Sequence, residues 1–470
     1  MLPAPFEQQM RDLLGAAYPD FTKALQTVAP VSIRLNPAKT GSVPDALPFA
    51  ADTQVLWHPQ GYYLPERPVF TLDPALHAGA YYVQEASSMF LYQALHQTVD
   101  FSKRLKVLDL CAAPGGKSTL IGAMLGTDSL LVANEVIKNR CAILRENLER
   151  WGLPNVAVTS AAPEDFDALE GFFDLVVVDA PCSGEGLFRK DPRAIAEWSP
   201  AHVSFCAGRQ RHILAAAVDA LAPGGILVYS TCTYNRLENE DNTAWLTQTF
   251  PLEARALSVD PAWGLDGDEK GYHFFPHRTK GEGFFIAVFE KQGTPRSGNA
   301  LPPFKPQNPK IKTQNATPGA FKHLKPLSKA LLPLLQPWID AAQALRFFEL
   351  SSGEILALPA SLENDYLILD KALHAKWFGV NIGSLKGKDF IPSHALALST
   401  IAAPGLPSLE LDREQALRFL KKETFDPPAD TAKGWTLASY KGFKLGWMKL
   451  LPNRMNNYLP PERRIRMNYE

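Results

Sequence analysis

Short apolar runs alternate with helical stretches between residues 76 and 291. Nearly every position in these runs is apolar, as expected for parallel strands that are buried on both faces of a sheet. The predicted strands cover residues 105–110, 130–134, 156–159, 175–179 and 226–230. Helical spacing over 138–151 and 203–221 separates them, and two last strands, around 272–277 and 283–290, are close enough to pair antiparallel. The pattern predicts a doubly wound α/β sheet, whose ligands bind beyond the carboxyl ends of the strands.

Different patterns precede and follow this region. Residues 1–75 predict a small module. Helical spacing over 10–26 is followed by the segment 31–41, which reads as a short strand running into a turn, and Pro is frequent up to Pro74. Residues 292–330 read as a basic linker, because the segment 291–330 has eight Lys or Arg and no Asp or Glu. The basic residues are Lys291, Arg296, Lys305, Lys310, Lys312, Lys322, Lys325 and Lys329. A solvated linker and a linker that also touches phosphates both remain open.

The remainder of the chain predicts small mixed α/β domains, one over 331–395 and one over 396–470. The stretch 441–470 holds seven basic and two acidic residues together with Trp447 and Tyr458. Such a mixture can bind a phosphate backbone and stack on bases, or it can be an ordinary surface.

The composition narrows the class of protein. A chain of 470 residues suggests two to four domains, and a hydrophobic content of 46% is that of a globular protein. The net charge of −1 means that any basic surface must be local. The first residues lack a basic start followed by an apolar run, so we expect no signal peptide. The most apolar stretch, 327–348, is broken by charges and prolines and predicts a packed amphipathic helix rather than a membrane span.

The five cysteines are an odd number without a CxxC pair. A disulfide framework or a zinc site is therefore not expected, no other metal site is predicted, and free thiols suit the reducing cytoplasm.

The first chemical motif, DLCAAPGGKS at 109–118, stands where a predicted strand passes into a helix. Gly115 and Gly116 let the backbone approach a ligand closely. The triplet Gly-Lys-Ser suggests a phosphate loop, but that motif needs a glycine five positions before Gly116, where Cys111 stands. The GxGxxG fingerprint of dinucleotide sites is also absent.

Three further motifs follow strand ends. VANE at 132–135 places Glu135 about 20 residues after the glycine loop, where a carboxylate can accept the hydroxyl hydrogens of a ribose. DAPCSGEG at 179–186 and YSTCTYN at 229–235 place Cys182 and Cys232 at the ends of neighbouring strands. A single buried cysteine is more often inert core than nucleophile. Two cysteines at the ligand-binding edge make covalent catalysis the favoured interpretation.

With these motifs the chain resembles the Sun-type RNA 5-methylcytosine methyltransferases, from its start to about residue 290. DLCAAPGGKS, DAPCSGEG and STCTYN have the order and spacing of that family, and the accessory segments IRLNPAK (33–39), YVQEASSM (82–89), FRKDP (188–192) and GEGFF (281–285) accompany them. The C-terminal region is similar to the bacterial branch that acts on 16S rRNA and carries a PUA-like RNA-binding domain, here 396–470. The resemblance implies a Rossmann-like methyltransferase domain over 76–291 that uses S-adenosyl-L-methionine, and an RNA-binding role for 1–75.

The resemblance also implies roles for individual residues. The methionine part of the cofactor would be held by Cys111, Ala112, Ala113, Pro114, Gly115, Gly116 and Lys117. Glu135 would bind the ribose with Arg140 beside it, and Asp179 would face both the cofactor and the target base. Ala162 stands where the family has an acidic or amide residue near the adenine, so Glu164 or backbone groups are alternatives for that contact. Cys232 would be the nucleophile and Cys182 the second cysteine, which helps to release the product.

Cytosine chemistry explains these residue types. Thiolate addition at carbon 6 makes carbon 5 nucleophilic, and loss of the carbon 5 proton later expels the thiol. Asp179 can hydrogen-bond the ring at nitrogen 3, and Lys117 can influence its charge and favour a thiolate. The base must be flipped or single-stranded. Chemistry alone does not choose between the two cysteines. DNA cytosine methyltransferases use a Pro-Cys nucleophile, which points to Cys182, whereas the resemblance points to Cys232.

The motifs argue against two other functions. Enzymes that methylate exocyclic amines carry Asn/Asp-Pro-Pro-aromatic after the fourth strand, where this chain has DAPC. An inactive RNA-binding or ribosome-assembly factor would not need Cys182, Cys232 and Asp179 together. The expectation is a monomeric cytoplasmic enzyme that acts on 16S rRNA or the small ribosomal subunit, with no DNA or membrane partner.

Overall fold

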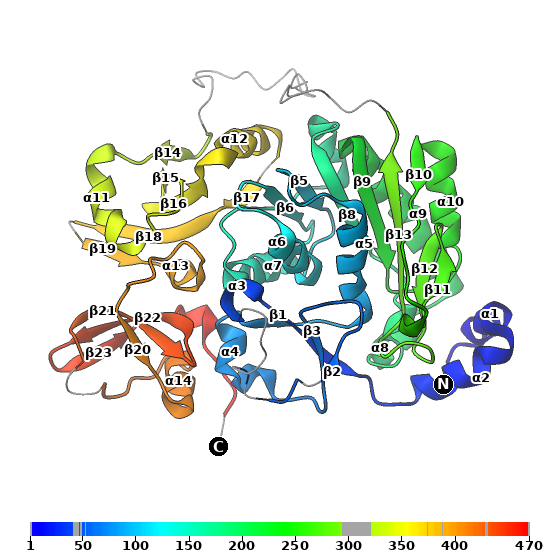
Figure 1. Ribbon diagram of the computed structural model, residues 1–470, viewed down its shortest axis with the longest axis horizontal. Coiled ribbons are helices and arrows are strands. Elements are labelled where there is room, and N and C mark those ends of the chain that lie inside the picture. Colours follow the sequence, from blue (N-terminus) through cyan, green and yellow to red (C-terminus); the bar gives the residue numbers. More distant parts are fainter. Residues whose placement is uncertain are drawn as a thin grey trace.

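The computed structural model describes residues 2–40, 47, 49–51, 53–293, 321–373, 375–387, 389–427 and 431–468. A 10-stranded sheet lies at its centre, in the order β11-β12-β13-β9-β8-β5-β6-β7-β17, with β10 paired to β13 (Figure 1). Five neighbouring strands are parallel: β5 (Lys106–Asp109), β6 (Leu130–Asn134), β7 (Val156–Thr159), β8 (Phe173–Asp179) and β9 (Leu221–Thr231). Antiparallel strands extend both sides: β10 (Leu252–Ala254), β11 (Asp266–Asp268), β12 (Gly271–Phe274), β13 (Phe284–Lys291) and β17 (Ala375–Phe378).

Each face of this sheet has its own core, which explains the nearly continuous apolar runs. Val107 packs into one core and the next residue, Leu108, into the other, and both are fully buried. Residues of α9 (Pro200–Ala220) and α10 (Glu240–Thr249) contribute to the core on the Leu108 face. The core on the Val107 face includes residues of α5 (Leu91–Thr98), α6 (Gly116–Met124) and α7 (Lys138–Trp151). Because every position meets a core, these strands lack the polar alternation of half-exposed ones.

The predicted doubly wound sheet is therefore confirmed. Each of the five predicted parallel strands is present, and β12 and β13 pair antiparallel as the short connection between them suggested. Helices α7 and α9 cover the two helical stretches read from the sequence.

The N-terminal module contains a four-stranded antiparallel sheet in the order β2-β3-β1-β4. Its elements are α1 (Ala4–Leu14), α2 (Tyr18–Leu25), β1 (Val31–Leu35), α3 (Pro37–Thr40), β2 (Thr53–Gln54), β3 (Gly61–Leu64), α4 (Pro74–His77) and β4 (Tyr81–Val83). The boundary expected at residue 75 cuts across this sheet, because β4 pairs with β1. Helices α1 and α2 lie apart from this sheet, near α8 (Pro192–Glu197) (Figure 1). Phe6 of α1 packs there on Phe188.

The C-terminal part forms two further sheets. The first, in the order β14-β15-β16-β18-β19, contains β14 (Leu324–Pro326), β15 (Leu345–Leu350), β16 (Glu354–Pro359), β18 (Val380–Lys386) and β19 (Asp389–Pro392). The second, β20-β21-β22-β23, contains β20 (Ser408–Glu410), β21 (Gly434–Tyr440), β22 (Phe443–Leu451) and β23 (Arg454–Asn457). The helices are α11 (Leu332–Leu335), α12 (Glu363–Ala372), α13 (His394–Leu398) and α14 (Arg413–Leu420).

The predicted helix over 327–348 is wrong. Only α11 is α-helical there, and the segment continues through a 3-10 turn into β15. Pro333 stands in the first turn of α11, and Pro337 stands just beyond its last residue, where a prolonged helix could not accommodate it. Among the described residues, no helix is long and apolar enough to cross a bilayer.

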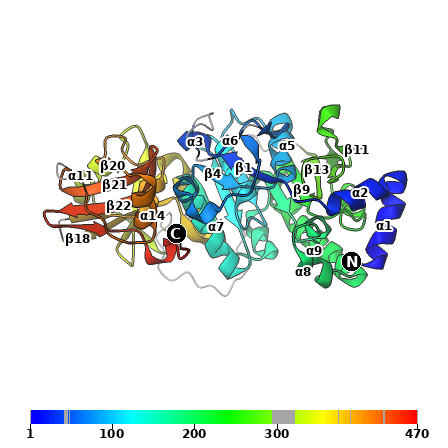
Figure 2. The same cartoon turned by 90° about the horizontal axis from the view of Figure 1, so that it is seen from below.

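The two ends of the chain share one hydrophobic core. Ile33 and Tyr81 of the N-terminal sheet lie in the same cluster as Phe419 of α14 and Met448 of the last sheet. Figure 2 shows α14 and the last sheet beside the N-terminal module. The β17 strand, from the expected 331–395 subdomain, extends the central sheet beside β7. The C-terminal part is thus fixed to both earlier parts of the chain. The predicted linker 292–330 lies mostly outside the described residues, which omit 294–320.

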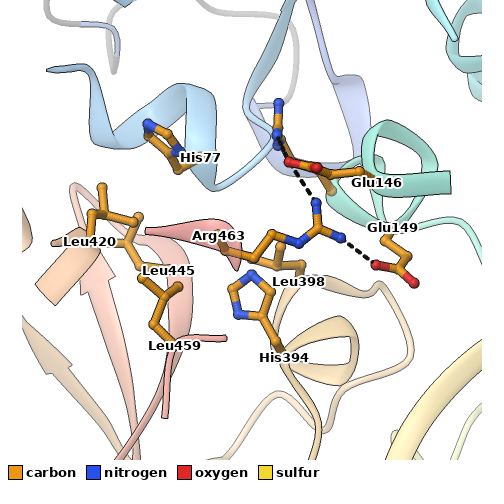
Figure 3. Close-up of a pocket in the computed structure, with 10 residues that line it drawn as sticks. His77, Glu146, Glu149, His394, Leu398, Leu420, Leu445, Leu459 and Arg463 are labelled. Carbon is orange, nitrogen blue, oxygen red and sulfur yellow. Dashed lines mark hydrogen bonds and ion pairs between the residues drawn. The ribbon is translucent and has the colours of Figure 1, made fainter. Parts of the chain in front are cut away.

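A polar junction also joins these parts. Arg463 makes ion pairs with Glu146 (2.6 Å) and Glu149 (2.7 Å) on α7, beside a cavity that His77 and His394 also line (Figure 3). None of the predicted site residues lines this cavity. The ion pairs of Arg463 join the chain that follows the last sheet to α7, so we assign this junction a structural role.

Candidate active site

The glycine loop connects β5 to α6 and takes the shape that its sequence predicted. Gly115 has a φ of 115°, and a Cβ atom there would lie 3.3 Å from Leu144. A side chain at this position would therefore strain the backbone and crowd α7. The loop stays open on its other side, where Cys111, Ala112 and Lys117 line a cleft.

Glu135 follows β6 and is held in a fixed orientation. One carboxylate oxygen accepts the backbone N–H of Ile137 (2.9 Å), and the other pairs with Arg140 (3.2 Å). Arg140 also donates to the carbonyl of Ala113 in the glycine loop (2.9 Å). The two predicted residues are therefore brought together beside the loop. Each carboxylate oxygen retains a lone pair for a further donor, such as a sugar hydroxyl.

Asn134, which sequence reasoning missed, ties three strand ends together. Its amide nitrogen donates to the carbonyls of Leu110 (3.2 Å) and Ala161 (3.0 Å), and its oxygen accepts from Thr159 (2.7 Å). The residue precedes Glu135 and is buried. Its position in the motif VANE was the only signal in the sequence.

Ala162, the residue expected near an adenine, brings no polar side chain. Its N–H donates to the carboxylate of Asp165 (2.9 Å), so this backbone donor already has a partner. Glu164 points to His212 and pairs with it. Its own backbone N–H and then His212 lower the pKa of the exposed Glu164 carboxyl. The adenine contact at Ala162 stays a prediction.

Lys117 and Asp179 both line the cleft and form an ion pair. The ammonium of Lys117 lies 2.8 Å from Asp179 Oδ2, and the Ser230 hydroxyl donates to Asp179 Oδ1 (2.8 Å). Asp179 ends β8, and Ser230 is its register partner on β9. The carboxylate is thus oriented by a cation on one side and a hydroxyl on the other.

The two predicted cysteines are in contact. Cys182 Sγ and Cys232 Sγ lie 2.6 Å apart as free thiols, and the backbone N–H of Cys232 also points to Cys182 Sγ (3.3 Å). The hydrogen bond to Cys232, together with burial, raises the pKa of the Cys182 thiol. Cys182 therefore favours the protonated form and can donate to Cys232 Sγ.

Cys111 and Cys206 differ from this pair. Burial raises the pKa of Cys206 to about 11, and burial likewise raises the pKa of the Cys111 thiol, with the charge of Asp109 adding to it. Both are poorly suited to act as nucleophiles. Among the residues described, no group of three or more His, Cys, Asp or Glu could hold a metal ion.

The cleft has a second wall, formed by residues that were not predicted as site residues. Tyr82, Gln84, Glu85 and Ser88 face the glycine loop across an open space of about 530 Å³ that Asp179 also lines. These four residues belong to the segment YVQEASSM, which the sequence had marked only through its family resemblance.

The accessory segments hold this second wall in place. Arg34 is buried and donates to Gln84 (2.8 Å), to Thr119 (2.6 Å) and to the carbonyl of Gly116 (3.2 Å). Burial lowers the pKa of Arg34 to about 9, so its cation persists at neutral pH. On the other side, Arg189 pairs with Glu282 (3.0 Å). The cleft is therefore supported by residues of three accessory segments, IRLNPAK, FRKDP and GEGFF.

Three segments of the chain match protein families. Residues 97–290 match 16S rRNA methyltransferase RsmB/F, residues 2–86 match the N-terminal domain of 16S rRNA methyltransferase RsmF, and residues 406–465 match the methyltransferase RsmF PUA domain. The matches cover the N-terminal module, most of the central sheet and the last sheet, and leave residues 291–405 unmatched.

Two relatives match the chain over nearly its full length. The chain is 32% identical to ribosomal RNA small subunit methyltransferase F of Pectobacterium atrosepticum, over 98% of this chain and 95% of the relative. It is 31% identical to the protein of the same name from Escherichia coli O81, over 98% and 96%.

Among solved structures, a methyltransferase homolog protein from Pyrococcus horikoshii is 28% identical with a TM-score of 0.52, over 61% of this chain and 94% of that one. NSun6 from the same organism, solved with SFG, shares the fold with a TM-score of 0.52 at 22% identity, over 62% and 99%.

Proposed function

Since the chain belongs to the family of ribosomal RNA small subunit methyltransferase F, we propose that it transfers a methyl group from S-adenosylmethionine to carbon 5 of a cytosine in 16S rRNA. One observation carries the proposal. Cys182, in the loop after β8, and Cys232, directly after β9, are free thiols in contact with each other. Asp179 ends β8 and is paired with Lys117. A thiol pair beside a carboxylate suits covalent activation of a pyrimidine ring.

The residues present fit the cofactor. The glycine loop and Asp179 line one open cleft, and Glu135, held beside the loop, keeps acceptor sites for ribose hydroxyls. Cys111 to Lys117 would hold the methionine part, while Ala162 and the backbone around it would contact the adenine. S-adenosylmethionine would supply an electrophilic methyl group at this place.

The chain's own residues would activate the base. The thiolate of Cys232 would add to carbon 6 of a flipped cytosine, which makes carbon 5 nucleophilic. The Lys117–Asp179 pair would hold the proton that hydrogen-bonds nitrogen 3 of the ring. Loss of the carbon 5 proton would then expel Cys232 and restore the aromatic ring.

The contacts of Cys182 support the ranking of the two cysteines. Because its pKa is raised, Cys182 holds its proton and Cys232 is the better candidate for the nucleophile. Cys182 would then act after methyl transfer, in the release of Cys232 from the product.

Two variants test this assignment. Purified Cys232→Ala should neither methylate 16S rRNA nor form protein–RNA adducts on denaturing gels. Cys182→Ala should form adducts that accumulate. The opposite pattern would exchange the two roles.

The rRNA for the assay is prepared from a deletion strain, and transfer is followed with labelled S-adenosylmethionine. Bisulfite sequencing of RNA from that strain should show at least one cytosine that has lost its methyl group. An unchanged cytosine map would refute the function, and labelled transfer to an exocyclic amine would replace it with the rival methyltransferase chemistry.

The remaining parts would bind the RNA. We assign this role to the N-terminal module and to the last sheet, whose matched families are domains of the same rRNA methyltransferases. The enzyme is proposed to act as a monomer in the cytoplasm, where rRNA is found and thiols stay reduced.

A further inference from the structure

Glu238 is a fully buried carboxylate six residues after Cys232, and it belongs to none of the predicted sites. Within the part of the chain that the structure describes, no Lys, Arg or His forms an ion pair with it. A buried charge without a cation is costly unless several hydrogen bonds stabilise it.

Three N–H donors converge on the carboxylate of Glu238. The backbone N–H of Ser183 lies 3.0 Å from Oε2, and the side-chain amide of Gln210 donates to the same oxygen (2.6 Å). The side-chain amide of Asn235 donates to Oε1 (2.7 Å). All three donors are fixed, so only a group with two acceptor oxygens satisfies them.

These donors hold the chain on both sides of Cys182. Ser183 follows Cys182 directly, and its N–H is held by Glu238. Pro181 precedes Cys182, and its carbonyl accepts from the same Gln210 amide (3.1 Å) that donates to Glu238. One carboxylate and one amide thus fix the loop immediately before and after this sulfur.

Cys232 depends on different contacts. It follows the last residue of β9, which is paired with β13 up to Thr231, and its carbonyl accepts the N–H of Gly186 (2.9 Å). The position of Cys232 is therefore set mainly by the central sheet, and the position of Cys182 by the loop that Glu238 holds.

We propose that Glu238 is a positioning residue that holds Cys182 against Cys232 for release of the methylated base. The inference rests on the proposed function and concerns the second half of the reaction. The negative charge of Glu238 also adds to the contacts that raise the pKa of Cys182, after the hydrogen bond to Cys232 and burial, and so supports the protonated form of this thiol.

The decisive variant is Glu238→Gln. An amide has the same size, but its NH2 group would face N–H donors, so the loop around Cys182 must move. A displacement of about 1 Å can reduce a rate by about 100-fold. We expect turnover to fall about 10- to 100-fold and covalent adducts to accumulate on unmodified RNA, as they should in Cys182→Ala.

Glu185→Gln is the matched control. Glu185 is equally buried and also accepts several N–H donors, among them Tyr234 N–H (2.9 Å) and Trp198 Nε1 (3.0 Å). These two contacts join the loop to aromatic residues. Glu185 shares the Asn235 amide (3.2 Å) with Glu238, but it receives neither the Ser183 N–H nor the Gln210 amide, which hold the chain on both sides of Cys182. The control should lose thermal stability without accumulating adducts.

The measurements are adduct fraction, turnover and Tm for the full-length wild type, Glu238→Gln, Glu185→Gln, Cys182→Ala and Cys232→Ala. Accumulation of adducts in Glu238→Gln, with none in Glu185→Gln, supports the inference. Turnover at the wild-type level, or loss of turnover without adducts, overturns it. If wild type and Cys182→Ala form no adducts on any RNA, the proposed function itself fails.

Discussion

Asp109 offers a test of how burial controls charge at the start of the glycine loop. The residue ends β5, is fully buried, and accepts the Ser118 hydroxyl at Oδ2 (2.6 Å). Its Oδ1 has no hydrogen-bond partner among the described residues. Burial raises the pKa of Asp109 to about 7 from its ordinary value of 3.8, and the charge of Asp179 adds to this. Asp109 is thus protonated in the folded protein under conditions where the unfolded chain has lost that proton.

The direction of the pH effect follows from this difference. Between about pH 4 and pH 7 the folded state binds more protons than the unfolded state, so the free energy of unfolding falls as pH rises through this window. Each pKa unit corresponds to about 1.4 kcal/mol. Because of Asp109, the free energy of unfolding of wild type should therefore fall by roughly 3 kcal/mol between pH 5 and pH 8. Asp109→Asn removes the titration and can still accept the Ser118 hydroxyl.

Unfolding of wild type and Asp109→Asn is measured at pH 5 and pH 8 by calorimetry. The new amide nitrogen lowers the free energy of unfolding of the variant by the same amount at both pH values. This contribution therefore cancels when the variant is compared with wild type at pH 5 and pH 8. At about 2–4 °C per kcal/mol, the Tm of the variant should rise by about 5–10 °C relative to wild type between pH 5 and pH 8. Asp100→Asn, at an exposed position, should follow wild type over this range. A Tm difference between Asp109→Asn and wild type that is equal at both pH values would refute the reasoning.

Two further predictions concern packing at the active site and at the junction of the last sheet. A Cβ atom at Gly186 would lie 2.5 Å from the carbonyl oxygen of Gly283 and 2.9 Å from that of Cys232. Gly186→Ala should therefore displace Cys232, the proposed nucleophile, and abolish adduct formation. Binding of S-adenosylmethionine, measured by calorimetry, should remain, and wild-type adduct levels would contradict the expectation. Arg463→Leu should leave Glu146 and Glu149 facing an apolar side chain and lower the free energy of unfolding by about 1–3 kcal/mol, seen as a lower urea midpoint. An unchanged midpoint would show that the junction is held by apolar contacts alone.

The sequence was sufficient where a local pattern has one structural solution. Strands that are apolar at every position need a core on each face, and only a sheet covered by helices provides this. Gly115 needs a left-handed backbone conformation beside α7, so its loop could be recognised before the structure. Asp179 ends β8, Cys182 lies in the loop after it and Cys232 follows β9, so all three lie at one edge of the sheet.

The stretch 327–348 shows where local reading fails. Its apolar spacing suited a helix, but Pro333 and Pro337 limit α11 to Leu332–Leu335 and the chain then forms β15. The residues after Pro337 pair with strands elsewhere in the chain, and nothing within the segment encodes those partners.

What the sequence determined by itself was the central sheet, its glycine loop and the strand ends that carry the reactive groups, because these depend on short-range patterns of burial and backbone freedom. The tertiary structure decided which side chains meet across loops: Arg34 with Gln84, the last sheet with the first, and Glu238 with the chain around Cys182. Such contacts join residues far apart in the sequence. Their hydrogen bonds depend on distances of a few tenths of an ångström, which only the folded chain fixes.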